Sequence, residues 1–105
     1  MASASVFNWG EVRGESAGGV DRRQIEGGGA DLKRIEIAAG TVAGKHDHAF
    51  EQFVQVLEGG GRLQCDAGEI ELKPGTVLHF PAGSWHSAVF EKDTVLVEVN
   101  LRPEA

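Results

Sequence analysis

Two of the four histidines in this 105-residue sequence, His46 and His48, are separated by a single residue. On an α-helix their side chains would point about 200° apart, because each successive residue rotates by about 100°. On a β-strand, residues two apart lie on the same face. The two imidazoles can therefore share one ligand only where the backbone is extended. The same alternation predicts that Gln52, Val54 and Val56 lie on the histidine face.

The residues after the histidine pair are compatible with either a helix or a strand. Helical spacing relates five apolar residues: Ala49, Phe50, Phe53, Val54 and Leu57. The run Val54-Gln55-Val56 favours a strand instead, because β-branched side chains suit extended backbone. We expect the strand, since only the strand lets the imidazoles act together. Phe53 and Leu57 would then lie on the opposite face.

The rest of the sequence is divided into short segments by its 15 glycines and by prolines. Residues 18–40 contain two candidate strands around a Gly-Gly-Gly turn, and residues 59–75 contain two more, joined by a turn at 66–68. Residues 76–80 form a short candidate strand that ends at Pro81. Residues 94–101 alternate most clearly, with Thr94, Leu96, Glu98 and Asn100 on one face. This pattern predicts an all-β sandwich or barrel, as a single domain over residues 1–105, with the first ~15 residues as an edge strand or a tail.

The composition excludes several classes of function. The formal net charge is −6 and the basic residues are scattered, so no basic stripe predicts binding to nucleic acid or to a membrane surface. The single cysteine, Cys65, cannot form an internal disulfide bond. The N-terminal residues do not resemble a signal peptide, and no apolar run of ~20 residues is present. We therefore expect a cytoplasmic protein without a membrane or nucleic-acid partner.

Two motifs resemble those of the cupin superfamily. Gly40-x5-His46-x-His48-x3-Gln52-x6-Gly59 is similar to the first cupin motif, which usually has Glu where this sequence has Gln52. Gly75-x5-Pro81-x-Gly83-x2-His86 is similar to the second motif, which commonly closes with Asn where this sequence has Phe90. The two motifs cover about half of the sequence in the family's order. The resemblance implies a small all-β barrel of the jelly-roll type, also called a double-stranded β-helix.

The resemblance also implies a metal site inside this barrel. Its ligands would be His46, His48 and His86, with Gln52 in the place of the family's acidic ligand. Imidazole nitrogen suits Zn, Ni and Fe, and oxygen donors extend the choice to Mn. Four such ligands would leave positions open on one divalent transition metal ion, as in catalytic sites. A neutral Gln52 leaves the ion more positive, which favours polarising a substrate carbonyl or carboxylate over activating oxygen.

Similar cupins with a His-x-His, Gln and His ligand pattern include small proteins that ketonise unsaturated uronates. In those proteins an acid and an arginine near the C-terminus assist the reaction. Glu98 and Arg102 occupy the comparable region here, at a different spacing. Glu98 is therefore the single weak candidate for a catalytic residue, and a polar residue of the barrel wall is the alternative for it.

The other notable side chains are expected to be structural. His79 matches no ligand position of either motif, and Cys65 is expected to be a small buried apolar residue. Trp85 and Phe90 are expected to pack in the core or at the rim. Arg62, which follows a glycine turn, is expected to be solvated.

Three functions are compatible with these residues. The first is a metalloenzyme of the isomerase, lyase or dioxygenase type that acts on a small oxygen-rich substrate. The second is a binding or sensing module for a sugar or carboxylate, and the third is a barrel whose metal site is lost or merely structural. The resemblance also implies a homodimer, in which Phe53 and Leu57 would contact the partner or fill the space between sheets.

Overall fold

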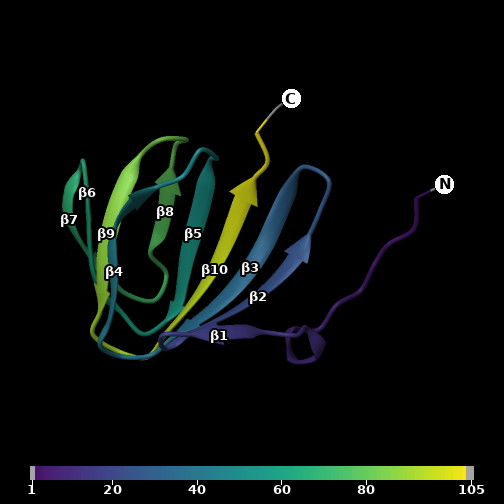
Figure 1. Cartoon of the computed structure of the whole chain (residues 1–105), viewed down its shortest axis with the longest axis horizontal. Coiled ribbons are helices and arrows are strands. Elements are labelled where there is room, and N and C mark those ends of the chain that lie inside the picture. Colours follow the sequence, from purple (N-terminus) through teal and green to yellow (C-terminus); the bar gives the residue numbers. More distant parts are fainter. Residues whose placement is uncertain (1, 104–105) are drawn as a thin grey trace.

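The computed structural model describes residues 2–103, and these form two antiparallel β-sheets that face each other (Figure 1). The six-stranded sheet has the order β1-β2-β3-β10-β5-β8. Its strands are β1 (Glu15–Ala17), β2 (Val20–Glu26), β3 (Ala30–Ile37), β10 (Thr94–Leu101), β5 (Gln52–Glu58) and β8 (Val77–Phe80). The prediction of an all-β barrel of the jelly-roll type is confirmed.

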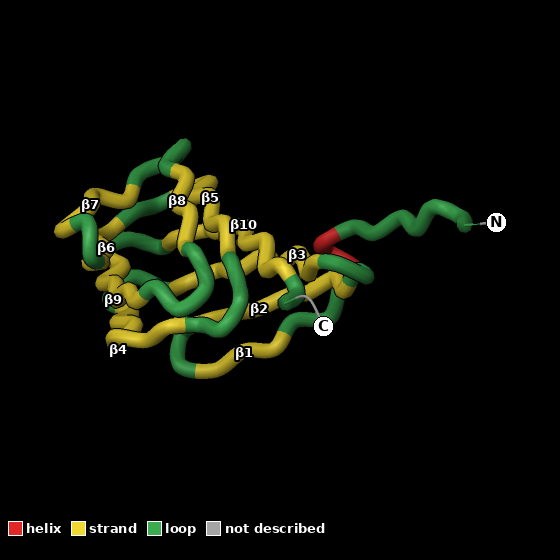
Figure 2. The backbone as a smooth tube through the Cα atoms, turned by 90° about the horizontal axis from the view of Figure 1, so that it is seen from above, coloured by secondary structure: helices red, strands yellow, loops and turns green. Residues whose placement is uncertain are grey.

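The four-stranded sheet has the order β4-β9-β6-β7. Its strands are β4 (Thr41–Asp47), β9 (Trp85–Phe90), β6 (Gly61–Cys65) and β7 (Gly68–Leu72). This sheet lies across one end of the six-stranded sheet, while β2 and β3 extend beyond it (Figures 1 and 2). The inner face of β2 and β3 is consequently open to solvent, with Arg22, Gln24 and Glu26 exposed.

The core lies between the two sheets and is built from inward-facing aliphatic and aromatic side chains. Its buried members are Ile35, Ile37, Val54, Val56, Leu63, Leu72, Leu78, Phe80, Ala88, Phe90 and Leu96. Val56 is only 1% exposed, and burying such a side chain stabilises a fold by roughly 1.5–3 kcal/mol. Along β5 the buried residues alternate with exposed ones, as expected for a strand with one face in the core.

The segment that contains both histidines and Gln52 is not one continuous strand. β4 ends at Asp47, and the chain bends through Ala49 and Phe50 before β5 begins at Gln52. The prediction of extended backbone was right for both halves, and Val54 and Val56 are buried beside Gln52 as expected. The prediction that one strand carries all of these residues was wrong, because the bend transfers the chain from the four-stranded sheet to the six-stranded one.

The predicted turns are present. The turn at 66–68 joins β6 to β7, and Gly68 has a φ of 104°, which favours glycine. Pro81 and Gly83 form the turn before β9, where the carbonyl of Pro81 accepts a hydrogen bond from the Ser84 N–H at 3.1 Å.

Of the two alternatives expected for the first ~15 residues, the edge strand is present only at their end, where β1 begins. β1 is an edge strand, and a 3₁₀ helix, η1 (Trp9–Glu11), precedes it. The residues before η1 lead away from the barrel in both views (Figures 1 and 2). Within residues 2–103, no helix is long and apolar enough to cross a membrane.

Candidate metal centre

β4 and β9 bring the three predicted histidine ligands together. His46 lies opposite His86 in the antiparallel register, and residues paired in this way project from the same side of a sheet. A register irregularity separates Ala43 from His46, and such bulges re-aim the side chains that follow. His48 comes directly after β4, and its carbonyl accepts a hydrogen bond from the Gly83 N–H at 2.7 Å. The turn before β9 is thereby tied to the histidine pair.

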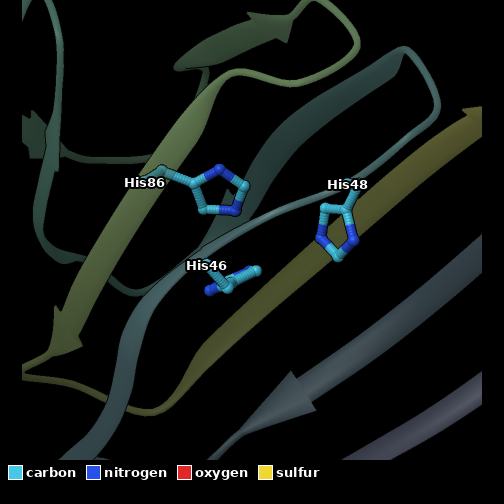
Figure 3. A group of neighbouring side chains, drawn as sticks. All are labelled: His46, His48 and His86. Atoms are coloured by element: carbon cyan, nitrogen blue, oxygen red, sulfur yellow. The ribbon is translucent and has the colours of Figure 1, made fainter.

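The three imidazoles turn toward a common space (Figure 3). Each offers one nitrogen, and the three nitrogens all lie within 4.8 Å of one another. The ring centroids of His46 and His86 are 4.3 Å apart, and those of His46 and His48 are 5.0 Å apart. Such proximity is what one metal ion bound by three imidazoles requires.

The ring of His46 is held by a hydrogen bond to the backbone. Its Nδ1 atom lies 2.7 Å from the carbonyl oxygen of Gly44. Because a carbonyl oxygen only accepts, Nδ1 carries the hydrogen, and Nε2 keeps a free lone pair. Metal-binding histidines are commonly oriented in this way by a carbonyl or carboxylate on the second ring nitrogen.

The ring of His86 is buried and is held by stacking. It is 8% exposed, and its centroid lies 4.2 Å from that of Phe80. Burial lowers the pKa of His86 to about 4, with a further contribution from the neighbouring His46 and His48. Burial also lowers the pKa of His48, whose ring stacks on Phe50 at 4.7 Å. Both rings are therefore neutral near pH 7, the form in which imidazole binds a metal.

Gln52 reaches this region from the facing sheet, as the first residue of β5. It is 4% exposed, and its Nε2 donates to Asn100 Oδ1 at 2.9 Å and to Glu98 Oε1 at 3.1 Å. A carboxylate accepts hydrogen bonds only, so the amide nitrogen must face Glu98. Both amide hydrogens are then engaged, and the carbonyl oxygen is the atom left for another partner.

Glu98 lines the same cavity as Gln52 and the three histidines. Burial raises the pKa of the Glu98 carboxyl, although Lys33, Arg22, His46 and Gln52 oppose that rise. Among residues 2–103, the close group of metal-ligating donors contains the histidines without Glu98. Glu98 is thus a polar residue of the barrel wall, which was one of the two expectations for it. The other expectation, a role in catalysis, stays a prediction.

The cavity has a volume of about 350 Å³ and a mostly apolar lining. Its wall also includes Arg22 of β2 and Lys33 of β3, two basic residues that sequence reasoning did not select. Asn100, which orients Gln52, was missed as well. The alternation of side chains along the strand could have indicated Asn100, because it lies two residues after Glu98 and therefore on the same face of β10.

The remaining candidate residues are accounted for outside the cavity. Arg102 donates to Gly27 O at 3.0 Å and to Asp31 Oδ1 at 2.6 Å, which ties the end of β10 to the β2–β3 turn. His79 lies 2.6 Å from Glu51 on the outer face of the six-stranded sheet. Both side chains therefore have structural partners.

The residues that were expected to pack in the core or at the rim can also be located in the structure. Phe90 is buried in the core, and Cys65 is half-buried and packs against the core. The ammonium of Lys45 lies 4.4 Å from the ring centroid of Trp85, a cation–π contact. The side chain of Arg62 is 61% exposed, in agreement with the expectation that it is solvated.

The histidine cluster fits a divalent transition metal ion. Two rings are kept neutral by burial, and the third has its lone pair fixed by Gly44. The buried Nδ1 of His86 has no hydrogen-bond partner among the described residues, so stacking and not a hydrogen bond sets that ring's orientation. The fold and the cluster together define a small two-sheet antiparallel β-barrel with a candidate three-histidine metal site inside.

Comparison with known families identifies the family of this barrel. A family model for the cupin domain matches residues 33–100. The chain therefore belongs to the cupin family. No match was found among curated proteins.

Three solved structures illustrate the fold. KdgF from Halomonas sp. shares 20% identity at a TM-score of 0.85, over 97% of each chain. Ectoine synthase from P. lautus shares 19% identity at a TM-score of 0.86, over 97% of this chain and 80% of that one. Oxalate decarboxylase from Bacillus subtilis, which has Mn(II) centres, shares 14% identity at a TM-score of 0.81, over 100% of this chain and 32% of that one. At these identities the likeness concerns the fold.

Proposed function

We propose that this cupin is a metal-dependent enzyme acting on a small oxygen-rich substrate. His46, His48, His86 and Gln52 would hold one divalent ion, and the cavity beside them would hold the substrate. The observation that carries this proposal is the group of three imidazole nitrogens within 4.8 Å of one another. Their donor chemistry suits Zn, Ni, Mn or Fe, and the Mn(II) centres of the oxalate decarboxylase neighbour support the same set.

A divalent ion bound there would supply Lewis acidity, which polarises a carbonyl or carboxylate oxygen of the substrate. Gln52 would bind through its carbonyl oxygen, because Asn100 and Glu98 occupy its amide hydrogens. A neutral oxygen donor leaves the full divalent charge for the substrate. This favours isomerase or lyase chemistry over the dioxygenase type.

Glu98 would move the proton in such a reaction. Its carboxylate lies against the Gln52 amide, at the wall of the cavity and outside the ligand group. A carboxyl in this position can take a proton from a carbon next to a polarised carbonyl and return it elsewhere.

Solvent-deuterium exchange tests this function without knowledge of the natural substrate. Zinc- or manganese-loaded protein is incubated in D₂O with a panel of small 2-oxo acids and sugar acids, and ¹H NMR follows their carbon-bound hydrogens. We expect exchange or conversion that requires the metal and is lost in Glu98→Gln, while Glu98→Gln keeps its metal. Compounds that bind and return unlabelled and unchanged would instead identify a binding or sensing module.

We also propose that two copies associate through the outer face of the six-stranded sheet. An apolar row crosses four strands there, in which Ile25 pairs with Leu32, Leu32 with Val99, and Val99 with Phe53. Leu32 and Phe53 are 38% and 40% exposed, and monomeric proteins rarely leave such a continuous apolar surface uncovered. A second copy of the chain is a suitable partner, because a two-fold axis brings the same apolar row of both subunits into contact.

A further inference from the structure

Outside the ligand group, two basic side chains lie in the cavity wall. Lys33 is half-buried in β3, where it lies opposite Glu98 of β10. Arg22 lies in β2 opposite Ile35, a core residue, and so projects from the inner face of the sheet. Both line the cavity that also contains the histidines. The open end of the barrel, where β2 and β3 extend past the smaller sheet, therefore has two cationic groups at the mouth of the site.

Six of the ten basic residues, Arg22 and Lys33 among them, form no ion pair with a carboxylate of the described residues. Four arginines form ion pairs with carboxylates: Arg23, Arg34, Arg62 and Arg102. Within residues 2–103, neither Arg22 nor Lys33 has a carboxylate within 4.0 Å. In a chain with 16 acidic residues and a net charge of −6, cations directed into a cavity without a paired acid are available to an external anion.

Glu98 lies next to these cations on the inner face of the sheet. Lys33 pairs with Glu98 across β3 and β10, and Arg22, Lys33 and Glu98 all line the cavity that contains the histidines. A molecule in the cavity therefore lies beside all three side chains. The Glu98 carboxyl offsets part of the positive charge of Arg22 and Lys33.

We propose that Arg22 and Lys33 form an anion subsite that binds the carboxylate of the substrate at the mouth of the cavity. This inference rests on the proposed function for the identity of the site. The planar guanidinium of Arg22 matches a carboxylate with two parallel hydrogen bonds, and the ammonium of Lys33 adds a point charge. Because Glu98 offsets part of the positive charge of Arg22 and Lys33, a carboxylate monoanion suits this subsite better than a phosphate dianion. The subsite would orient the substrate with its remaining oxygens toward the histidines.

The subsite is tested with glycolate as the probe, by ¹⁵N–¹H NMR titration of zinc-loaded and metal-free protein. We expect Lys33→Met and Arg22→Met each to weaken glycolate binding about tenfold or more, since a charge-assisted hydrogen bond is lost. Arg34→Met is the matched control, because it removes one positive charge from the outer face of β3, the strand that carries Lys33. The affinity of Arg34→Met for glycolate should equal that of the wild-type protein. Glycolamide, which has no charge, should bind all four proteins alike.

Separate measurements distinguish failure of the subsite from failure of the metal centre. Zinc affinity by calorimetry should be unchanged or higher in Lys33→Met and Arg22→Met, because a nearby positive charge is removed. Equal glycolate affinities in Lys33→Met and Arg34→Met would overturn the subsite, and so would tighter binding of inorganic phosphate that depends on both residues. If zinc does not bind, while glycolate binding to metal-free protein still depends on Arg22 and Lys33, the subsite holds and the metal-dependent function fails.

Discussion

Gln52 is the residue at which this cupin departs most clearly from a carboxylate ligand. Its amide is fixed by two acceptors, Asn100 and Glu98, at 2.9 Å and 3.1 Å. The amide can satisfy both acceptors and still present its oxygen, which a carboxylate in the same place cannot do. The neutral residue therefore keeps Glu98 ionisable, and it would leave a bound ion more positive than a carboxylate ligand would.

The substitution Gln52→Glu separates these two effects. We expect the variant to bind zinc about tenfold more tightly, because a negative charge enters the ligand set. We also expect it to lose metal-dependent deuterium exchange, because two carboxyls would face each other at the present hydrogen-bond distance and one must retain a proton. Calorimetry and ¹H NMR measure the two quantities. Unchanged or weaker zinc affinity would show that residue 52 does not bind the ion.

Protonation of the imidazoles predicts how metal binding depends on pH. A proton and the metal compete for the same lone pair, so acid weakens binding. Zinc occupancy should be constant from pH 8 to about 6.5 and begin to fall below about pH 6. The loss should become complete toward pH 4, since the pKa of His86 lies at about 4. Equilibrium dialysis measures the occupancy, with circular dichroism as a check on folding. Constant occupancy from pH 8 to pH 4 would exclude a three-histidine site.

At the scale of elements, the sequence predicts the strands better than it predicts the site. Alternation in residues 94–101 and the glycine turns identify the strands directly, because side-chain period and φ requirements are local properties. The bend at Ala49 and Phe50 has no local signal, since these apolar residues fit a strand or a helix equally well. The bend places Gln52 on the sheet that faces the histidines. This placement depends on how the two sheets pack, which a local sequence pattern does not indicate.

Lys33 and Arg22 illustrate the same limit for the cavity. Charged residues at alternate positions of a strand usually mark a solvated face, and nothing in the sequence separates these two from Arg23 or Arg34. They face the cavity because Arg22 pairs with the core residue Ile35, and Lys33 pairs with Glu98, on the inner face of the sheet. His46, His48 and His86 were predictable because two motifs specify them, whereas Arg22 and Lys33 lie outside both.

The close approach of β6 to β9 gives a prediction for the barrel itself. A Cβ atom at Gly61 would overlap the carbonyl oxygen of Val89 and lie 2.9 Å from the Cα of Phe90. Gly61→Ala should therefore lower the free energy of unfolding by about 1–3 kcal/mol. Gly28→Ala, where a Cβ meets nothing within 4 Å, should change it by no more than about 0.5 kcal/mol. Urea denaturation measures both, and equal values for the two variants would contradict this packing.

At the scale of the whole molecule, charge and apolar surface are distributed unevenly. The net charge of −6 repels anions at a distance, so an acidic substrate would depend on the local cations of the cavity. The apolar row from Ile25 to Phe53 lies on the other side of the same sheet. One sheet would thus serve the substrate on its inner face and a second subunit on its outer face.

Sedimentation velocity tests this assembly. We expect the protein to sediment as a dimer and Phe53→Asp to sediment as a monomer, because a charge buried in the apolar row carries a desolvation cost. Val89→Asp is the control, since Val89 is 43% exposed against 40% for Phe53 and lies on the four-stranded sheet. A monomeric wild-type protein, or a dimer that Phe53→Asp leaves intact, would contradict the proposed interface.

The most direct test of the metal centre is anomalous diffraction from crystals grown with zinc. We expect one strong anomalous peak in the cavity, within bonding distance of one nitrogen each from His46, His48 and His86 and of the Gln52 carbonyl oxygen, and no such peak in His46→Ala crystals. A cavity without a peak in the wild-type protein, or a zinc ion bound elsewhere while these three rings stay free, would contradict the proposed metal centre.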